Sequence, residues 1–523
     1  MTTFQQPARD DMKKEEINKT SAFKNGSQTS LLRMIQFSIQ SCLICFSIGF
    51  LVALVYTISF RIGYPFELEW LEGDMLLATV RLLSHQSLYT APSTEYIAAI
   101  YPPLYYIISA VAFWLFEPSL PVLRGVSVVF LTGIFLQLYF IIFGATHKRW
   151  LGVLGMGIFA SFYGFHESWY DIGRLDSVFY CLLIGGLWLS SQINNQKLVI
   201  SGALVLCLAF FTKQSVAIYI PFVIFYLLLK NRRLSVIFSL MLGLLCSSAF
   251  IYLNATTDGW FTVLTILNPM SLPKNWLSKV DYLKDTFGVF PIFMMIAVAG
   301  IASLFKKKWG VSKFSFWELM FIPAVITYLR IRPIKGAATN DSMYLTVWFS
   351  ILIPLWLSRI SKLKQTTPHR EIVSSVCMLL ICIQMAPLIY SPEKWTPAPG
   401  SAKKGEELLS ILRNAPGPVF IPNHPAYAWM AGKEPFLHSC NLWVYNAGKR
   451  NVYEPDDLLE KIKSGYFSVI VLDDTSPLRD PIIYERIINN YSLERYIEYK
   501  SPLEFNTLIG YRTRPQTIWV YKK

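Results

Sequence analysis

Long apolar runs recur through the first three quarters of the chain and limit the folds that are open to it. The first covers about 24 residues from Phe37 to Phe60, which is enough for a helix to cross the hydrocarbon core of a bilayer. Ten more follow, at 122–146, 150–167, 177–193, 198–212, 215–229, 234–253, 288–305, 315–330, 342–358 and 372–390. Because 53% of the residues are hydrophobic and only 16% are charged, a water-soluble protein is excluded. We predict an α-helical polytopic membrane protein with about 11 spans.

The positive charge of the chain also narrows its class. It carries 48 Lys and Arg against 34 Asp and Glu, which gives a net charge of +14. A surplus of this size can indicate nucleic-acid binding, but many of the basic residues stand in short clusters between the apolar runs. That distribution is typical of the cytoplasmic loops of a membrane protein. We therefore expect membrane lipid, and no nucleic acid, among the partners.

The run from Tyr101 to Phe116 decides the orientation of the later spans, because counting it as a span reverses them all. If it lies in the interface or re-enters, five basic clusters fall on the side of the N-terminus: residues 147–149, 197, 230–233, 306–313 and 359–370. The positive-inside rule favours this arrangement. We therefore expect residues 1–36 to form a basic cytoplasmic tail. The acid-bearing loops would then face outward: 61–121, 166–176 and 254–287.

The composition changes sharply after Tyr390. A Pro-rich linker over residues 391–402 leads into about 120 residues of ordinary globular composition, 403–523. Within them Lys403 to Asn414 is helix-like, and three stretches are strand-like: 418–421, 467–473 and 517–522. The sequence thus predicts a membrane module over residues 37–390, with the first outer loop at 61–121, followed by a small α/β domain outside the cytoplasm.

The first outer loop carries the densest group of acids, within FELEWLEGDMLLATV at residues 66–80. From Asp74 onward Leu76, Val80 and Leu83 fall on one helical face, as expected for a helix that lies along the membrane surface. Glu72 and Asp74 are about 200° apart on a regular helix, so one of them can face a site but not easily both. The alternative is that these acids are solvated loop charges.

A second group of charges lies in the loop HESWYDIGRLDS, residues 166–177. Asp171 and Arg174 stand at i,i+3, and Asp176 lies at the mouth of the next span. Ionisable residues beside two spans are unfavourable unless they are paired or functional. Two interpretations stay open: a functional cluster, or an interfacial ion pair between Asp171 and Arg174.

Two groups of cations fall on the outer side, where the positive-inside rule gives no reason for them. Lys213 stands between two apolar runs in FFTKQS, and Arg330, Arg332 and Lys335 follow a later run. Fixed positive charges at a membrane surface suit a lipid-linked phosphate, because they stabilise it as a leaving group. The alternative is that these side chains snorkel to lipid headgroups.

Acids and cations on one face fit base-assisted attack by an acceptor hydroxyl on a sugar whose leaving group is a polyprenyl phosphate. No nucleotide-binding loop is present, and the six His show no metal-ligand spacing. We therefore predict no metal ligands. The acids leave a divalent cation open as a cofactor, but no motif requires one.

At these residues the chain resembles the GT-C glycosyltransferases, polytopic membrane enzymes that use polyprenyl-phosphate sugars. The resemblance covers roughly residues 37–390. It rests on these segments: the acids Glu72 and Asp74, the helix from Ala78 to Leu83, Leu88-Tyr89, Tyr101-Pro102-Pro103-Leu104-Tyr105 before Arg124, Asp171 to Asp176, Thr212-Lys213-Gln214, and Asn340 to Tyr344. It implies a first outer loop with juxtamembrane helices. It also implies a substrate pocket that includes Tyr101, Pro102, Pro103, Gln214, Asn340 and Tyr344, with Lys213 approaching the lipid phosphate.

The resulting hypothesis is an inverting transferase of a hexosyl or pentosyl group that acts outside the cytoplasm. The general base would be Glu72, which its spacing to Ala78 and Leu82-Leu83 favours as the family's acid, or else Asp74. Asp171 and Asp176 would hold acceptor or sugar, with Arg174 paired to one of them. Lys213 and the group Arg330, Arg332 and Lys335 would stabilise the phosphate. The alternatives are a transporter or flippase of a lipid-linked glycan, and a non-catalytic GT-C-like subunit. The sugar, the lipid chain and the acceptor, whether glycan, lipid or protein, are not readable from the sequence.

Overall fold

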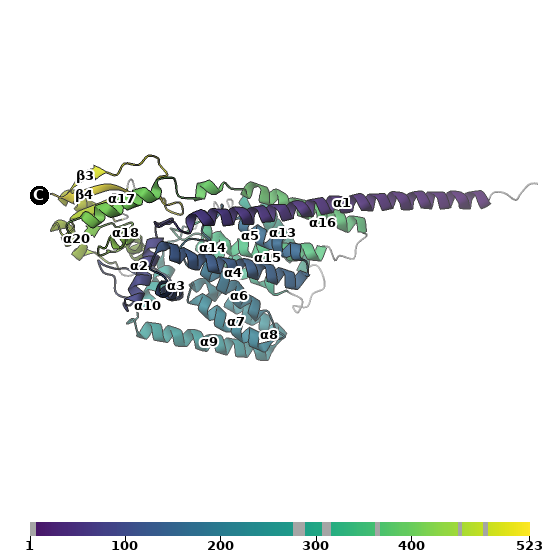
Figure 1. The fold of residues 1–523 in the computed structure, drawn as a ribbon. Coiled ribbons are helices and arrows are strands. Elements are labelled where there is room, and N and C mark those ends of the chain that lie inside the picture. Colours follow the sequence, from purple (N-terminus) through teal and green to yellow (C-terminus); the bar gives the residue numbers. More distant parts are fainter. Residues whose placement is uncertain are drawn as a thin grey trace, which may run out of the picture.

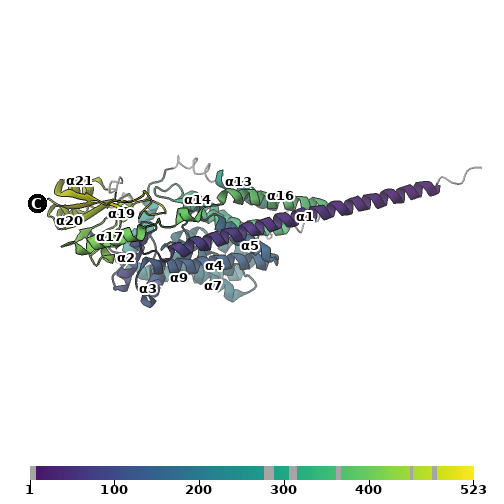
Figure 2. The same ribbon diagram turned by 45° about the horizontal axis from the view of Figure 1, so that its top comes forward.

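The computed structural model describes residues 7–275, 288–305, 315–360, 367–447, 452–473 and 480–522. Helices lie side by side in an elongated bundle, and a small α/β region covers one end of it (Figure 1). The first helix, α1 (Pro7–Arg61), runs along the bundle and extends far beyond its opposite end (Figures 1 and 2). Several charges used in the orientation argument lie outside the described residues: Asp281, Asp285, Lys306, Lys307, Lys308, Lys313, Lys362 and Lys364.

Each of the eleven apolar runs coincides with helix. After α1 these helices are α4 (Leu120–Thr146), α5 (Arg149–Ser161), α6 (Asp176–Ser190), α7 (Gln196–Phe210), α8 (Ile220–Lys230), α9 (Arg232–Ala255), α13 (Pro291–Phe305), α14 (Phe316–Ile331), α15 (Met343–Ile360) and α16 (Thr367–Met385). Within the described ranges, five helices are long and apolar enough to cross a membrane: Ser30–Arg61, Leu120–Thr146, Arg232–Ala255, Thr339–Ile360 and Arg370–Leu388. Others are shorter, and the 13 residues of α5 span only about 20 Å. The total of about 11 spans stays a prediction.

Small residues allow the central helix α5 to approach its neighbours closely. A Cβ atom added to Gly157 would lie 2.2 Å from Cβ of Ser47 on α1, and one added to Gly155 would lie 2.7 Å from the carbonyl oxygen of Ser350 on α15. Close backbone approach at small residues is the usual means of helix association in membranes. These glycines therefore allow the helices to pack closely.

The helix directions separate two ends of the bundle. Helix α4 starts beside the first outer loop, where Arg124 contacts Glu72, and its 27 residues carry the chain about 40 Å away. Two ion pairs lie toward the distant end: Arg33 with Glu371, at 3.2 Å, and Arg359 with Glu318. Each pair places one Arg and one Glu at the end opposite the α/β region. The predicted orientation of these ends relative to the cytoplasm stays a prediction.

The first outer loop folds into two short helices, α2 (Glu72–Leu83) and α3 (Leu104–Leu115). With 12 residues each, they are about 18 Å long, which is too short to cross the bilayer. Further short helical segments join the long ones: η1 (Gln214–Ile218), α10 (Trp260–Thr262), the π-helical turn η2 (Val263–Leu267), α11 (Asn268–Ser271), η4 (Thr339–Ser342), η5 (Ala386–Leu388) and η6 (Pro392–Trp395).

The α/β region contains one four-stranded sheet in the order β1-β2-β4-β3. Its strands are β1 (Val419–Phe420), β2 (Val469–Asp473), β3 (Tyr491–Tyr496) and β4 (Pro515–Tyr521), and only β1 and β2 run parallel. Its helices are α17 (Ser401–Asn414), α18 (Pro425–Met430), α19 (Ser439–Ala447), α20 (Asp456–Lys463) and α21 (Pro481–Asn490). The helix-like and strand-like stretches expected from the sequence coincide with α17, β1, β2 and β4, whereas β3 was not expected.

The α/β region rests directly on the first outer loop. The ring of Phe66 packs edge-on against Tyr427 and Phe505, with centroids 5.8 and 5.2 Å apart. The backbone N–H of Leu508 donates to the carbonyl oxygen of Leu68 at 2.8 Å. Apolar burial and backbone pairing therefore fix this region against the end of the bundle. Its predicted location outside the cytoplasm stays a prediction.

Candidate functional site

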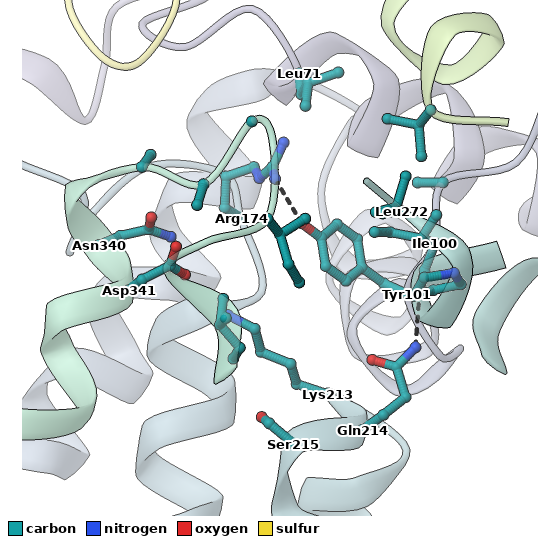
Figure 3. A pocket seen from close by; sticks show the side chains of 18 of the residues that line it. Leu71, Ile100, Tyr101, Arg174, Lys213, Gln214, Ser215, Leu272, Asn340 and Asp341 are labelled. Carbon is teal, nitrogen blue, oxygen red and sulfur yellow. Dashed lines mark hydrogen bonds between the residues drawn. The ribbon is translucent and has the colours of Figure 1, made fainter. Parts of the chain in front are cut away.

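A cavity of about 500 Å³ lies between the end of the helical bundle and the α/β region. Figure 3 shows it from close by, with side chains converging from several separate segments. Its walls come from the first outer loop, the loop before α6, the connection at Lys213, the segments 265–274 and 330–341, and the α/β region. Segments far apart in the sequence therefore meet in a single enclosure.

The cavity collects about half of the site residues predicted from the sequence. The predicted residues that line it are Asp74, Tyr101, Arg174, Lys213, Gln214, Arg330, Lys335 and Asn340. The predicted residues outside its lining are Glu72, Pro102, Pro103, Asp171, Asp176, Arg332 and Tyr344. Of the two acids proposed as a base, Asp74 thus reaches the cavity and Glu72 does not, in keeping with their separation on the helix.

Glu72 is fully engaged by other groups. Its carboxylate accepts from Nε and Nη2 of Arg124 at 2.9 and 2.6 Å, and from the backbone N–H groups of Leu68 and Gly173 at 2.7 and 2.6 Å. Burial opposes ionisation of Glu72, but the Arg124 guanidinium and these N–H groups hold its pKa below the usual value. A buried carboxylate with this set of donors is well suited to fix the loop and poorly suited to accept a proton.

Asp74 lies in the cavity wall and is held by one donor. Its Oδ1 accepts from Nδ2 of Asn441 at 2.9 Å, while its buried Oδ2 has no hydrogen-bond partner. Burial raises the pKa of Asp74 to about 6, although Asn441 and Arg174 act in the opposite direction. A carboxylate with a pKa near neutrality is suited to accept a proton at physiological pH.

Glu69 is a second acid of the cavity wall, and it holds Arg174. Its Oε2 accepts from Nη1 of Arg174 at 3.2 Å and from the backbone N–H of Leu71 at 3.1 Å. Burial raises the pKa of Glu69 to about 7 in spite of the Arg174 charge. The expected pairing of Arg174 with Asp171 or Asp176 does not form. Residues 171–175 make a series of bends instead of a helix, so the i,i+3 spacing does not bring these side chains together.

Asp171 belongs to a separate buried pair. Its Oδ2 lies 3.1 Å from Nε of Arg61, and its Oδ1 accepts from the hydroxyl of Tyr163 at 2.8 Å. Arg61 also donates to the carbonyl oxygen of Ser168. Asp171 therefore ties the end of α1 to the loop before α6, at a place that the cavity does not reach.

Lys213 enters the cavity and is anchored from behind by Asp176. Its Nζ lies 2.9 Å from Oδ1 of Asp176, whose Oδ2 accepts from the indole N–H of Trp169 at 2.8 Å. The ammonium also lies over the ring of Tyr344, 5.7 Å from its centroid. The hydroxyl of Tyr344 pairs with that of Ser215 at 2.6 Å. Asp176 and Tyr344 thus position Lys213 without lining the cavity.

Tyr101 and Gln214 shape the floor near Lys213 (Figure 3). The Tyr101 hydroxyl accepts from Nη2 of Arg174 at 3.2 Å, and Nε2 of Gln214 donates to the carbonyl oxygen of Ile100 at 2.8 Å. Pro102 and Pro103 come next and lead into α3, with Pro103 at its N-cap. Since a fixed φ and a missing N–H suit the start of a helix, the two prolines position Tyr101 from outside the cavity.

Three exposed cations line the cavity on the side of the segments 265–274 and 330–341: Lys274, Arg330 and Lys335. None of the three forms an ion pair with an acid in the described ranges, and Lys335 lies over the ring of Trp443, 5.4 Å from its centroid. Arg332 differs, because its Nη1 donates to the carbonyl oxygen of Ala338 at 2.6 Å. Of the predicted basic group, two members therefore reach the cavity and Arg332 supports their loop.

The sequence interpretation missed several lining residues: Glu69, Lys274, Asp341, Asn441, Trp443 and Tyr511. Glu69 stands three residues before Glu72 and could have been included from the same acidic motif. Asp341 directly follows Asn340 and has a buried oxygen, Oδ2, without a hydrogen-bond partner. The residues of the α/β region carry no local signal, because they reach the cavity only through the tertiary fold. Among the residues that the structure describes, no cluster of three or more His, Cys, Asp or Glu could hold a metal ion.

No protein-family model matches the chain, and no curated protein matches it by sequence. Its structure is similar to that of the archaeal oligosaccharyltransferase AglB from Archaeoglobus fulgidus in complex with an inhibitory peptide and a dolichol-phosphate. The TM-score is 0.50 at 11% identity, over 84% of this chain and 69% of AglB. A second structure of that oligosaccharyltransferase, tethered to an acceptor peptide, gives 0.50 at 12% identity, over 81% and 68% of the two chains. The chain has the GT-C fold.

The GT-C resemblance inferred from the sequence motifs is thereby confirmed at the level of the fold. ArnT from Cupriavidus metallidurans, bound to undecaprenyl phosphate, is also similar, with a TM-score of 0.47 at 13% identity over 92% of this chain and 98% of ArnT. The GT-C fold and the five helices of membrane-spanning length, counted within the described ranges, make the chain an integral membrane protein.

Proposed function

We propose that this protein is an inverting glycosyltransferase that moves a sugar from a polyprenyl-phosphate donor to an acceptor hydroxyl on the extracytoplasmic side of the membrane. The observation that carries the proposal is one cavity of about 500 Å³ in a GT-C fold, with acids and cations both in its walls. AglB, which has this fold, was solved with a dolichol-phosphate bound. The cations here suit a ligand of the same chemical class.

The cations would stabilise the departing phosphate. Lys274, Arg330 and Lys335 are exposed and lack ion pairs among the described residues, so their charge is available to a ligand. Lys213 lies deeper and is fixed by Asp176, which makes it a pre-oriented donor. Donors that are already in place strengthen as negative charge develops on the leaving oxygen, and this lowers the barrier to transfer.

Asp74 would be the general base. The acceptor oxygen attacks the anomeric carbon from the face opposite the phosphate, the bond from that carbon to the phosphate oxygen breaks, and the acceptor proton moves to Oδ2 of Asp74. Glu72 is not assigned this role, because Arg124 and two backbone N–H groups occupy its carboxylate. Glu69 would hold Arg174 toward Tyr101, and Asp171 would have no contact with the acceptor.

The test is transfer by the purified full-length protein, reconstituted in lipid with a panel of labelled polyprenyl-phosphate sugars and an extract of cell-envelope acceptors. Label transferred to acceptor and polyprenyl phosphate released are both measured. We expect Asp74→Asn to lower the rate by about 100-fold or more, the usual effect of removing a general base. Arg330→Ala should weaken donor use. Glu406→Gln, on the exposed face of α17, is the matched control.

Each outcome bears on the assignment. A wild-type protein that transfers no sugar from any donor of the panel would overturn the proposed function. Movement of intact lipid-linked sugar across the bilayer without release of polyprenyl phosphate would indicate a flippase instead. Wild-type rates in Asp74→Asn together with loss of activity in Glu69→Gln would move the base to Glu69.

A further inference from the structure

The α/β region reaches the cavity through helix α19. Its residues Cys440, Asn441, Trp443 and Val444 form part of the cavity wall, beside Gly510 and Tyr511. Of these, Asn441 contacts an acid to which the proposed mechanism gives a role: its Nδ2 donates to Oδ1 of Asp74 at 2.9 Å. Asn441 is itself buried, with 6% of its surface exposed, so solvent does not compete for this contact.

The orientation of the Asn441 amide is fixed by its second partner. Nδ2 also donates to the carbonyl oxygen of Ile97 at 2.8 Å, so both hydrogens of the amide are used. With the amide turned over, its oxygen would face a carboxylate and a carbonyl, and all three groups would be acceptors. The donor side therefore has to point toward Asp74.

The start of α19 is held in place by a histidine with a defined tautomer. Nδ1 of His438 accepts from the backbone N–H of Cys440 at 3.0 Å, so the proton resides on Nε2, which donates to the carbonyl oxygen of Trp70 at 3.2 Å. Burial lowers the pKa of His438 to about 3, and the ring stays neutral at physiological pH. This clamp joins α19 to the first outer loop one turn away from Asn441.

Asp74 depends on Asn441 more than on any other described group. The charge of Arg174 also acts on Asp74, but the ion pair of Arg174 is with Glu69, and the other titratable groups near Asp74 are the phenols of Tyr96 and Tyr106. Burial raises the pKa of both phenols, so they stay uncharged. The second oxygen of Asp74, Oδ2, has no hydrogen-bond partner. Asn441 thus determines which oxygen is occupied and which is left for a ligand.

We propose that Asn441 is a positioning residue of the α/β region that orients the carboxylate of Asp74 for proton acceptance in the cavity. The inference rests on the proposed function and deepens it, because it makes the α/β region part of the catalytic machinery. A donor to the carboxylate favours its ionised form, so the same contact keeps Asp74 available as a base near neutral pH.

The test is the pH profile of sugar transfer in the full-length protein with Asn441→Ala and Asn441→Asp. Loss of the donor should move the acidic limb of kcat/KM upward by about one pH unit, which lowers the rate by about 10-fold well below pH 6 and by about 2-fold at pH 7. Asn441→Asp keeps the shape of the side chain and places a second carboxyl beside Asp74, so it should move the limb further in the same direction. If Asn441→Ala folds poorly, the pH profile of Asn441→Asp alone tests the inference.

Asn446→Ala is the matched control, since Asn446 lies on the same helix, does not line the cavity and bonds to Tyr453. Its acidic limb should stay in place. A purely structural role for Asn441 predicts a uniform fall in rate with an unmoved limb, and that result would overturn the inference alone. A wild-type protein without transfer activity would refute the proposed function and with it the role of Asn441.

Discussion

Arg124 and Glu72, 52 residues apart in the sequence, form a two-pronged ion pair in which neither side chain has any exposed surface. The same guanidinium donates to the carbonyl oxygens of Tyr64 and Phe66. A single side chain therefore holds the backbone that connects α1 to α2. Removal of one partner of a buried pair leaves an uncompensated charge and typically costs about 3–5 kcal/mol.

We therefore expect Glu72→Ala to lower the stability of the protein strongly. Arg124→Lys should do so as well, because a lysine ammonium lacks the planar guanidinium that pairs with both oxygens of a carboxylate. The measurement is the thermal unfolding temperature of the purified protein in detergent. Glu393→Gln, at an exposed position, serves as the control and should leave it unchanged. Normal stability of Glu72→Ala with complete loss of transfer would return the role of base to Glu72.

His424 joins the α/β region to the first outer loop and should make stability depend on pH. Its Nδ1 pairs with Glu67 and its Nε2 lies 3.1 Å from Oδ2 of Asp473, with all three side chains buried. Burial opposes protonation, but the two carboxylates raise the pKa of His424 to about 10. Burial also raises the pKa of Glu67 to about 7 in spite of its contact with His424.

Both shifts act in the same direction. A group whose folded pKa is raised contributes stability that is present below its unfolded pKa and is lost as pH rises through the folded value. For His424 this window extends from about 6.5 to about 10. We expect the unfolding temperature of the wild type to fall by several degrees across the window. His424→Gln should flatten the curve, and a wild-type curve that rises there would contradict the assignment.

The pH dependence of transfer should follow Asp74 on its acidic side. Burial raises the pKa of Asp74 to about 6, so activity should fall as pH drops below that value and the carboxylate takes up a proton. Asp74→Asn should remove this limb along with most of the rate. Glu69→Gln should lower the rate and leave the limb near its wild-type position; a displaced limb in Glu69→Gln would indicate that Glu69 is the titrating base.

Helix packing at Gly157 gives a prediction that is independent of catalysis. Its Cβ would lie 2.2 Å from Cβ of Ser47, so Gly157→Ala forces α5 away from α1 and should cost about 1–3 kcal/mol. Gly144 on α4 has no atom within 4 Å of its Cβ position, and Gly144→Ala should be neutral or slightly stabilising. Equal unfolding temperatures for the two variants would refute the close contact.

The sequence predicts the helical layout well because one physical requirement governs it. A helix in a bilayer needs a long apolar run, and such runs are visible without tertiary information. The count of spans is less secure, since α5 is shorter than its apolar run of 150–167 and ends at Ser161. The strand β3 escaped notice because five of its six residues are exposed and carry no alternating apolar pattern.

The site was only partly predictable, because the contacts that define it join residues far apart in the sequence. Helix geometry predicted that Glu72 and Asp74 would not easily share a site, but the choice between them depends on Arg124, which is distant in the sequence. Arg174 was expected to pair locally, whereas its partner Glu69 lies 105 residues earlier. Asn441 is 367 residues from Asp74, and no local pattern announces such a contact.

The wall that α19 and Tyr511 add to the cavity has a consequence for biosynthesis. Glu69 and Asp74 are synthesised early in translation. The cavity that they line is complete only when α19 and Tyr511 have been synthesised, have reached the same side of the bilayer and have folded against them. In a nascent chain, or in one truncated before α19, the acids and cations therefore lie in a cavity that lacks this part of its wall. Folding of the α/β region and completion of the cavity thus coincide in one late assembly step.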